Sequence, residues 1–177
     1  MTLSPNGKLV YVTSENDGAV SVVDTVSAKV VATIKVGRRP RSVEFLPDGS
    51  RAFVTNENDG TVSVIDAIRQ EPLSTILLGE GLKPMGLAIN KAGSRLYVST
   101  GRSKKVFVLD TASNAIAASF EVGQRPWGIA LSPDEKLLFT ANGPSNDVSI
   151  VDAASGSIIR KVKAGDRPWG VVVVPRN

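Results

Sequence analysis

The chain contains no cysteine and no histidine among its 177 residues. Without cysteine there is no disulfide framework and no thiolate metal site. Without histidine the chain lacks the commonest catalytic base and metal ligand, so it holds no Ser/His/Asp triad and no histidine-ligated haem. We therefore expect no catalytic residues, no metal site and no cofactor.

Aromatic residues make up 5% of the chain, and no apolar run reaches the roughly 18 residues that a membrane span needs. The first five residues, Met1 to Pro5, lack the charged and apolar regions of a signal peptide, so no signal peptide is expected. The net charge of +4 is mildly basic. With few aromatic side chains to stack on bases, that charge favours solubility over nucleic-acid binding. We expect neither a membrane nor a nucleic-acid partner.

What the sequence does contain is a repeat. The motif Gly-Gln-Arg-Pro-Trp-Gly at residues 123–128 returns as Gly-Asp-Arg-Pro-Trp-Gly at 165–170, and degenerate copies begin at Gly37 and Gly79. A period of about 42 residues is the signature of stacked supersecondary units. The copy at Gly79 is longer, so we expect the loop that holds Glu80, Gly81 and Leu82 to be the most irregular of the set. The prolines of the four copies are Pro40, Pro84, Pro126 and Pro168.

Each period is predicted to form four short strands and no helix. In the second period the candidates are residues 42–46, 51–56, 61–66 and 73–78, and the third of these alternates polar and apolar residues as a half-buried strand does. The first strands, for example 128–131, are apolar throughout, which predicts burial on both faces. Four-stranded units with such a first strand fit a β-propeller, in which that strand lines the axis. We interpret residues 1–177 as one all-β propeller domain with periods 1–40, 41–84, 85–126 and 127–168 and a spare inner strand at 169–177.

The second strands carry a family resemblance. Residues 11–14, 53–56, 97–100 and 139–142 resemble the YVTN repeat of bacterial and archaeal β-propellers, and the strand that follows each of them is similar as well. The Arg-Pro-Trp-Gly motif is similar to that of the propeller associated with PQQ-dependent alcohol catabolism. The resemblance implies a periplasmic or secreted protein. This chain departs from the family in its lack of a predicted signal peptide and in its four periods, since such propellers commonly have seven blades.

In a propeller, the loops that precede the first strands lie on the same face as the loops between the second and third strands. A ring of cations there favours an anionic ligand, through bidentate pairing with carboxylate or phosphate. The alternative is that each cation pairs with a neighbouring acid and holds adjacent blades together. The tryptophans offer flat surfaces for a ligand ring, or they act as wedges between blades. The candidate ligand-binding residues are Arg39, Arg41, Lys83, Arg125, Trp127, Arg167 and Trp169, with Arg38 beside them.

A carboxylate metal site formed by Asp17, Asp59 and Asp147 is a further alternative, but turn formation explains these residues without a metal. Three functions remain open: a non-catalytic binding or scaffold module with a protein partner, which we favour, a propeller enzyme or redox accessory that binds a small anion, and a nucleic-acid binder. We further expect the blades to form an open arc or part of a larger ring, rather than a ring that the spare strand closes. An open arc would expose apolar blade ends, so we predict self-association.

Overall fold

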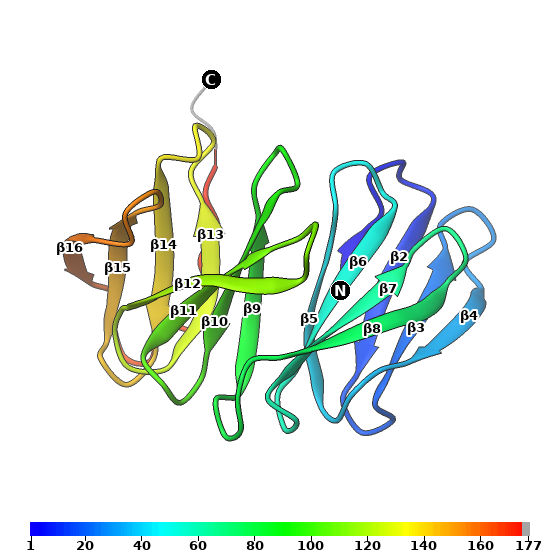
Figure 1. Cartoon of the computed structure of the whole chain (residues 1–177), viewed down its shortest axis with the longest axis horizontal. Coiled ribbons are helices and arrows are strands. Elements are labelled where there is room, and N and C mark those ends of the chain that lie inside the picture. Colours follow the sequence, from blue (N-terminus) through cyan, green and yellow to red (C-terminus); the bar gives the residue numbers. More distant parts are fainter. Residues whose placement is uncertain (175–177) are drawn as a thin grey trace. The chain divides into compact units, whose positions relative to one another are not determined.

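The computed structural model describes residues 1–174, and within that range every regular element is a β-strand. The strands form 4-stranded antiparallel sheets, each built from strands that are consecutive in the sequence (Figure 1). No helix in the described part of the chain is long and apolar enough to span a membrane. The all-β class and the four-stranded blades are thus confirmed, and we number the blades 1 to 4 in chain order.

The first half of the chain forms blades 1 and 2. Blade 1 consists of β1 (Thr2–Leu3), β2 (Leu9–Ser14), β3 (Ala19–Asp24) and β4 (Val30–Lys35), and blade 2 of β5 (Pro40–Phe45), β6 (Arg51–Asn56), β7 (Thr61–Asp66) and β8 (Glu71–Leu77). The second half forms the other two. Blade 3 consists of β9 (Pro84–Ile89), β10 (Arg95–Thr100), β11 (Lys105–Asp110) and β12 (Ala115–Glu121), and blade 4 of β13 (Pro126–Leu131), β14 (Leu137–Asn142), β15 (Asp147–Asp152) and β16 (Ile158–Lys163).

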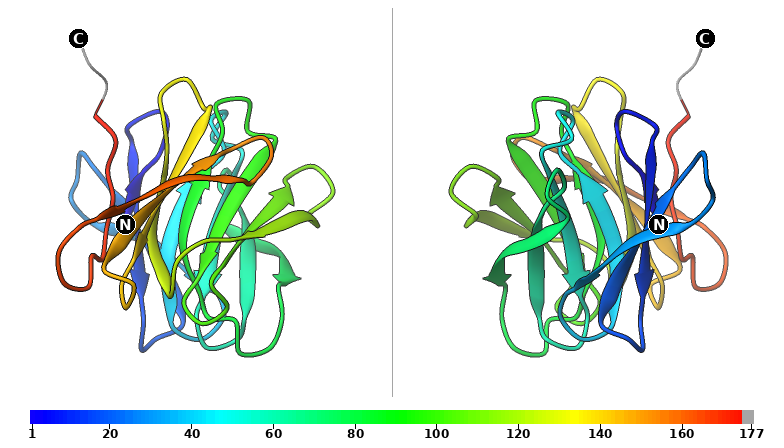
Figure 2. Two further views of the ribbon diagram at one scale, coloured as in Figure 1. Left: turned by 90° about the vertical axis from the view of Figure 1, so that its left-hand side faces the viewer. Right: turned by 90° about the vertical axis from the view of Figure 1, so that its right-hand side faces the viewer.

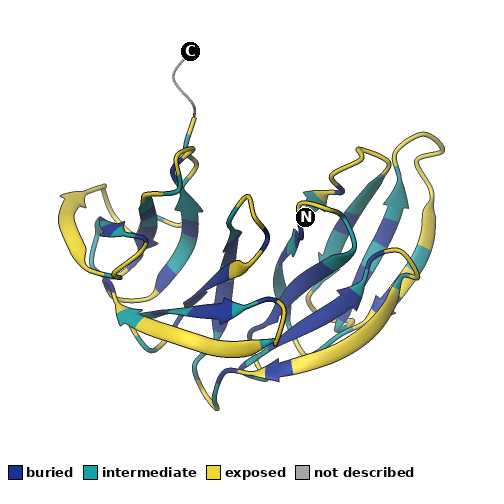
Figure 3. Cartoon of the chain, turned by 45° about the horizontal axis from the view of Figure 1, so that its top comes forward, coloured by how far each residue is buried: buried dark blue, intermediate teal, exposed yellow. Residues whose placement is uncertain are grey.

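The strands of each blade fan out with the twist that sheets adopt, so that the orange β16 is strongly inclined to the yellow β13 (Figure 2). The outermost strands are the most exposed, while the middle strands are mostly buried in blades 2 and 3 (Figure 3). The predicted bounds of β6 and β7 match the structure. The fourth strand of blade 2 starts earlier than predicted and includes Pro72. An edge strand tolerates proline because one side of it needs no amide donor.

The chain divides into two compact units. The N-terminal unit holds residues 1–84 and 91–93, and the C-terminal unit holds 85–90 together with the chain from Ser94 onward. Each unit has a core between its two blades. In the N-terminal unit Tyr11, Val20 and Val22 of blade 1 pack with Val43 and Phe45 of blade 2. In the C-terminal unit the core is built in the same way from Tyr97, Val106 and Val108 of blade 3 with Ile129, Leu138 and Val151 of blade 4.

A buried tyrosine hydroxyl connects the two blades of each unit. Tyr11 of β2 donates to the carbonyl oxygen of Ala67, in the turn after β7, at 3.5 Å. Tyr97 of β10 donates to the carbonyl oxygen of Ala153, in the turn after β15, at 3.3 Å. The corresponding second-strand residues of blades 2 and 4 are Phe53 and Phe139. We call this contact the tyrosine latch.

The aspartates that end the third strands form turns, as the sequence predicts. The carboxylate of Asp24 accepts hydrogen bonds from the amide and hydroxyl of Ser27, and Asp152 does the same with Ser155. Because these bonds favour the ionised form, they hold the pKa of both carboxyls below the usual range. The turns fix the start of the fourth strand in each blade.

The first strands differ in burial. In β9 most residues are buried, as predicted, whereas in β13 only Pro126 and Ile129 are. The spare strand predicted at 169–177 is not formed in the described residues, because nothing between Lys163 and residue 174 pairs in a sheet. The segment instead lies beside β13, where a Cβ added to Gly128 would come within 2.7 Å of the Cα of Gly170. The last three residues of the predicted strand, 175–177, lie outside the described residues.

Candidate functional site

The loop before β9 is the most irregular of the loops that lead into an inner strand, as predicted. It spans residues 78–83, whereas the corresponding loops span 36–39 and 122–125. Gly79 and Gly81 both have positive φ, at 150° and 73°. The amides of Leu78 and Gly79 both donate to the carbonyl oxygen of Gly60, which anchors the loop to blade 2.

In the N-terminal unit the basic loop residues are paired with acids. The guanidinium of Arg38 contacts the carboxylate of Asp59. Those of Arg39 and Arg41 both contact Glu15, which lies just after β2 and therefore belongs to blade 1. The predicted alternative, in which cations connect adjacent blades, describes Arg39 and Arg41, whereas Arg38 pairs within the blade that its loop precedes.

Glu57 is the centre of this network. Its side chain is 9% exposed and contacts Arg41 Nε at 2.8 Å, Arg39 Nε at 3.3 Å and Lys83 Nζ at 3.4 Å. Partial burial would raise the pKa of nearby Asp59, but the amide and guanidinium of Arg38 hold that pKa below its usual range. A pocket of about 440 Å³ next to the network is lined by charges of both signs, including Glu15, Asp17, Lys35, Arg38 and Arg39. Of the cations that line it, Arg38 and Arg39 are paired with carboxylates.

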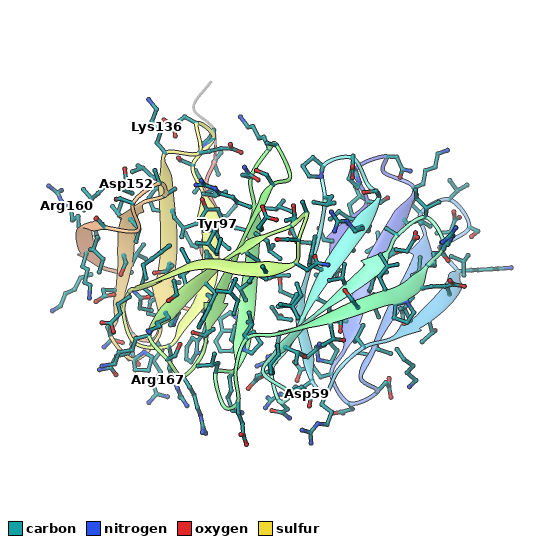
Figure 4. The ribbon with its side chains drawn as sticks, in the orientation of Figure 1. Asp59, Tyr97, Lys136, Asp152, Arg160 and Arg167 are labelled. Atoms are coloured by element: carbon teal, nitrogen blue, oxygen red, sulfur yellow. The ribbon has the colours of Figure 1, made fainter. Side chains whose placement is uncertain are left out.

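In the C-terminal unit both arginine loops attach to the turn between β14 and β15. Gly143 donates its amide to the carbonyl oxygen of Arg125 at 3.3 Å, and the amide of Gln124 donates to Ser145 Oγ at 2.6 Å. The amide of Arg167 donates to Asn146 Oδ1 at 2.9 Å. Arg167 lies at the end of this unit opposite Lys136 and Asp152 (Figure 4). Residues 143–146 therefore hold both arginine-bearing loops.

The two tryptophans stack on each other. Their ring centroids are 4.4 Å apart, with 39° between the planes. Trp127 is half-buried and covers Gly143 so closely that any side chain at position 143 would overlap its ring. Trp169 is 56% exposed. Trp127 thus packs against a turn of its own blade, while Trp169 is more exposed, and the predicted role of the tryptophans as wedges between blades stays a prediction.

The cation before each motif proline has an unusual backbone. Arg39, Lys83, Arg125 and Arg167 have φ of 57°, 56°, 50° and 47°. For a residue other than glycine this left-handed conformation costs about 1 kcal/mol or more. The same strained position therefore carries a long cationic side chain in each of the four loops.

Sequence reasoning gave no role to two buried asparagines. Asn56 and Asn142, the last residues of β6 and β14, are fully buried. Asn56 Oδ1 accepts the amide of Gly37, and the amide group of Asn142 donates to Asp147 and Ser149. A side chain at Gly37 or Gly123 would overlap these asparagines, so glycine is required at the start of each of these basic loops. The signal was present, because both residues end a YVTN-like segment.

The proposed carboxylate metal site has no support from these contacts. Asp59 is engaged by Arg38, and Asp147 by Asn142. Within residues 1–174 no group of three His, Cys, Asp or Glu side chains could hold a metal ion. The structure brings Arg39, Arg41 and Lys83 together in one unit, and Arg125, Trp127, Arg167 and Trp169 together in the other. Ligand binding by either group stays a prediction.

Comparison with known proteins supports the propeller fold. The structure of hydrazine synthase from Kuenenia stuttgartiensis superposes on this chain with a TM-score of 0.85 and 26% sequence identity, over 92% of this chain. The match covers 48% of that protein's chain, so this chain spans about half of its length. No curated protein matches the sequence. The model of the lactonase family with a seven-bladed β-propeller matches residues 24–174. The chain therefore belongs to the seven-bladed β-propeller lactonase family.

Proposed function

We propose that this chain is part of a β-propeller that acts as a non-catalytic binding or scaffold module. The observation that carries the proposal is that the charged loop residues of the N-terminal unit are paired with acids, whereas those of the C-terminal unit are exposed. Arg38, Arg39, Arg41 and Lys83 are engaged with acids that fasten the loops of the N-terminal unit. In the C-terminal unit the loops present exposed arginine and tryptophan, side chains that are enriched at protein interfaces.

The finer form of the proposal concerns the partner. The resemblance of the Arg-Pro-Trp-Gly motif supports a protein partner in a periplasmic quinoprotein oxidation system. Such a partner would bind the face that carries the motif at 125–128 and 167–170. Charge reversal at Arg125 and Arg167 would then abolish binding of the partner. Arg38 is the control, because it is paired with Asp59 and its reversal should lower the stability of the chain rather than partner binding.

The second candidate function is hydrolysis of a lactone, which the family match favours. The two functions separate in one pair of measurements on the purified chain. In a pH-stat we expect no hydrolysis of γ- and δ-lactones above the buffer rate. In a capture experiment we expect the parent chain to bind a defined quinoprotein oxidase and the Arg125→Glu/Arg167→Glu variant not to bind it. Lactone hydrolysis that depends on residues of this chain would overturn the binding proposal. If the parent chain and the Arg125→Glu/Arg167→Glu variant captured the oxidase equally well, the binding surface would lie elsewhere than at the motif.

A further inference from the structure

The turn between β10 and β11 differs in charge from its counterpart in blade 1. The three residues after β2, at 15–17, are Glu-Asn-Asp, whereas those after β10, at 101–103, are Gly-Arg-Ser. The next residue is Lys104, where blades 1 and 2 have Gly18 and Gly60. The repeat therefore places basic residues in blade 3 where it places acids in blade 1.

Lys104 stands at a position whose backbone favours glycine or asparagine. Its φ is 57°, and the equivalent residues Gly18 and Asn146 have φ of 59° and 56°. A lysine is strained in this left-handed region, whereas glycine adopts it freely. The hydroxyl of Thr100 fixes the turn, because it donates to the carbonyl oxygen of Lys105 at 2.7 Å. The chain thus keeps a cation here against the preference of its backbone.

Main-chain hydrogen bonds place this turn beside the two arginine loops of the same unit. The amide of Val122 donates to the carbonyl oxygen of Lys104 at 2.8 Å. Val122 begins the loop before β13, and that loop is itself held by residues 143–146, which also hold the loop after β16. All of these loops therefore lie at one end of the C-terminal unit, the end that Arg167 marks in Figure 4.

The cations at this end form no ion pair within residues 1–174, and only Lys105 among them is half-buried rather than exposed. Acids on the same segments are fewer. Glu121 lies opposite Lys105 on paired strands, and Asp147 lies opposite Lys163 in the same way. The third acid, Asp166, is exposed. We call this surface the basic end, and its cations are Arg102, Lys104, Lys105, Arg125, Lys163 and Arg167.

We propose that the basic end binds an acidic segment of a protein partner. A concentration of exposed cations attracts such a segment and speeds its encounter with the surface. The acids that interrupt the cations disfavour nucleic acid, which carries a phosphate on every nucleotide, whereas a protein segment can place neutral residues against them. This inference deepens the proposed binding function and rests on it, since it names the chemistry of the partner.

The probe is a fluorescein-labelled peptide of alternating glutamate and serine, which is titrated with the 177-residue chain and followed by fluorescence anisotropy. The same peptide with glutamine in place of glutamate lacks the charge, and a single-stranded oligothymidylate represents nucleic acid. We expect saturable binding of the glutamate peptide that weakens at higher salt, because the cations are exposed. We expect little binding of the glutamine peptide and weaker binding of the oligothymidylate at equal salt.

The double variant Arg102→Asn/Lys104→Gly gives the turn the residues that blade 1 has at these positions. It should weaken binding of the glutamate peptide by about tenfold, the combined effect of two exposed charge pairs. It should not destabilise the chain, because glycine relieves the strain at position 104. Lys136→Gln/Arg160→Gln removes two exposed cations of the same unit that lie away from Arg167 (Figure 4), and it should leave binding unchanged.

Glu121→Gln tests the same surface with the opposite sign. It removes an acid from the basic end and should strengthen binding of the glutamate peptide by about threefold. A gain in affinity does not arise from a folding defect, so this variant is informative even where the double variant fails to fold by circular dichroism.

Equal binding of the glutamate and glutamine peptides, or peptide binding that both the double variant and Glu121→Gln leave unchanged, would overturn the inference. Tighter binding of the oligothymidylate than of the glutamate peptide would also overturn it, in favour of a nucleic-acid surface. If the peptide fails to bind but the oxidase is still captured through Arg125 and Arg167, the proposed function stands and only the acidic segment is wrong. If the peptide binds the basic end but no oxidase is captured, the acidic segment stands and the quinoprotein partner is wrong.

Discussion

Glu44 lies half-buried on β5, directly across from Phe53 on β6. Burial raises the pKa of its carboxyl to about 7, and the amino group of Met1 offsets this effect only in part. No described side chain forms an ion pair with it. In the folded state the carboxyl therefore holds its proton more tightly than in the unfolded chain, where its pKa is about 4.3. Its effect on stability is thus favourable at low pH and is lost as pH rises.

We predict that the contribution of Glu44 to the free energy of unfolding falls between about pH 4.5 and pH 8, by at most about 4 kcal/mol, and is constant at higher pH. Glu44→Gln should remove the slope and stabilise the chain at pH 8. Urea denaturation at several pH values measures it, with Glu71→Gln on the exposed β8 as the control. An unchanged slope in Glu44→Gln would assign the pH dependence to other groups.

At the residue scale the sequence predicted which side chains gather at the loops but not which of them are neutralised. Arg39 and Arg125 occupy equivalent positions in the repeat. Only the folded chain shows that the former meets Glu15 and Glu57 and that the latter forms no ion pair with an acid among residues 1–174. The contact joins residues that lie far apart in sequence and on different blades. The exchange of Glu57 for Gly143 is visible in the sequence, and a comparison of the periods position by position would have detected it.

Among the elements, the strands were the most predictable part. Strands β6 and β7 match because turn residues bound them on both sides, and because β7 alternates polar and apolar residues while β6 is rich in Phe, Val and Thr. The predicted strand at 169–174 is absent from the structure. Its composition is that of an inner strand, but a strand also needs a hydrogen-bonding partner, which a local pattern cannot reveal.

The tyrosine latch gives an element-scale prediction. Tyr11→Phe and Tyr97→Phe each remove one buried hydroxyl and leave a buried carbonyl without its donor. Each should lower the free energy of unfolding by about 1 kcal/mol. Burial, with a smaller contribution from Asp66, raises the pKa of Tyr11 to about 12, so the latch of Tyr11 stays protonated over the practical pH range. Chemical denaturation measures the loss, and the double variant should show additive effects because the hydroxyls lie in separate cores.

The outcome that would contradict the latch is a phenylalanine variant as stable as the parent chain. Tyr11 and Tyr97 are largely buried, so the aromatic ring packs in the same way in the parent chain and in the phenylalanine variant. The contribution of the ring therefore cancels when the two stabilities are compared. A stability loss of several kcal/mol would indicate that more than the hydroxyl had changed.

At the scale of the whole molecule we expect self-association, which the sequence predicted from exposed blade ends and which stays a prediction. We expect it to involve the exposed apolar side chains near the end of the described chain. Val172 and Val174 are 81% and 76% exposed next to Trp169, on a segment with no strand partner. Exposed apolar side chains that are close together in the chain favour association.

Replacement of Val172 and Val174 by lysine should therefore shift the chain toward the monomer in a light-scattering concentration series. Val26→Lys is the matched control, because Val26 is 91% exposed but stands alone in a turn. A parent chain that is monomeric at every concentration would disprove the prediction, as would association that the lysines at 172 and 174 leave unchanged.

The alternation of the tyrosine latch also bears on how such a chain can be lengthened or shortened. The sequence repeats once per blade, but the hydroxyl recurs only in every second blade, at Tyr11 and Tyr97, with Phe53 and Phe139 between them. A couplet, meaning two consecutive blades, is therefore the smallest segment that contains a complete tyrosine latch. A gene duplication, or an engineer's splice, that copies a couplet preserves the alternation, whereas one that copies a single blade places two like residues in succession.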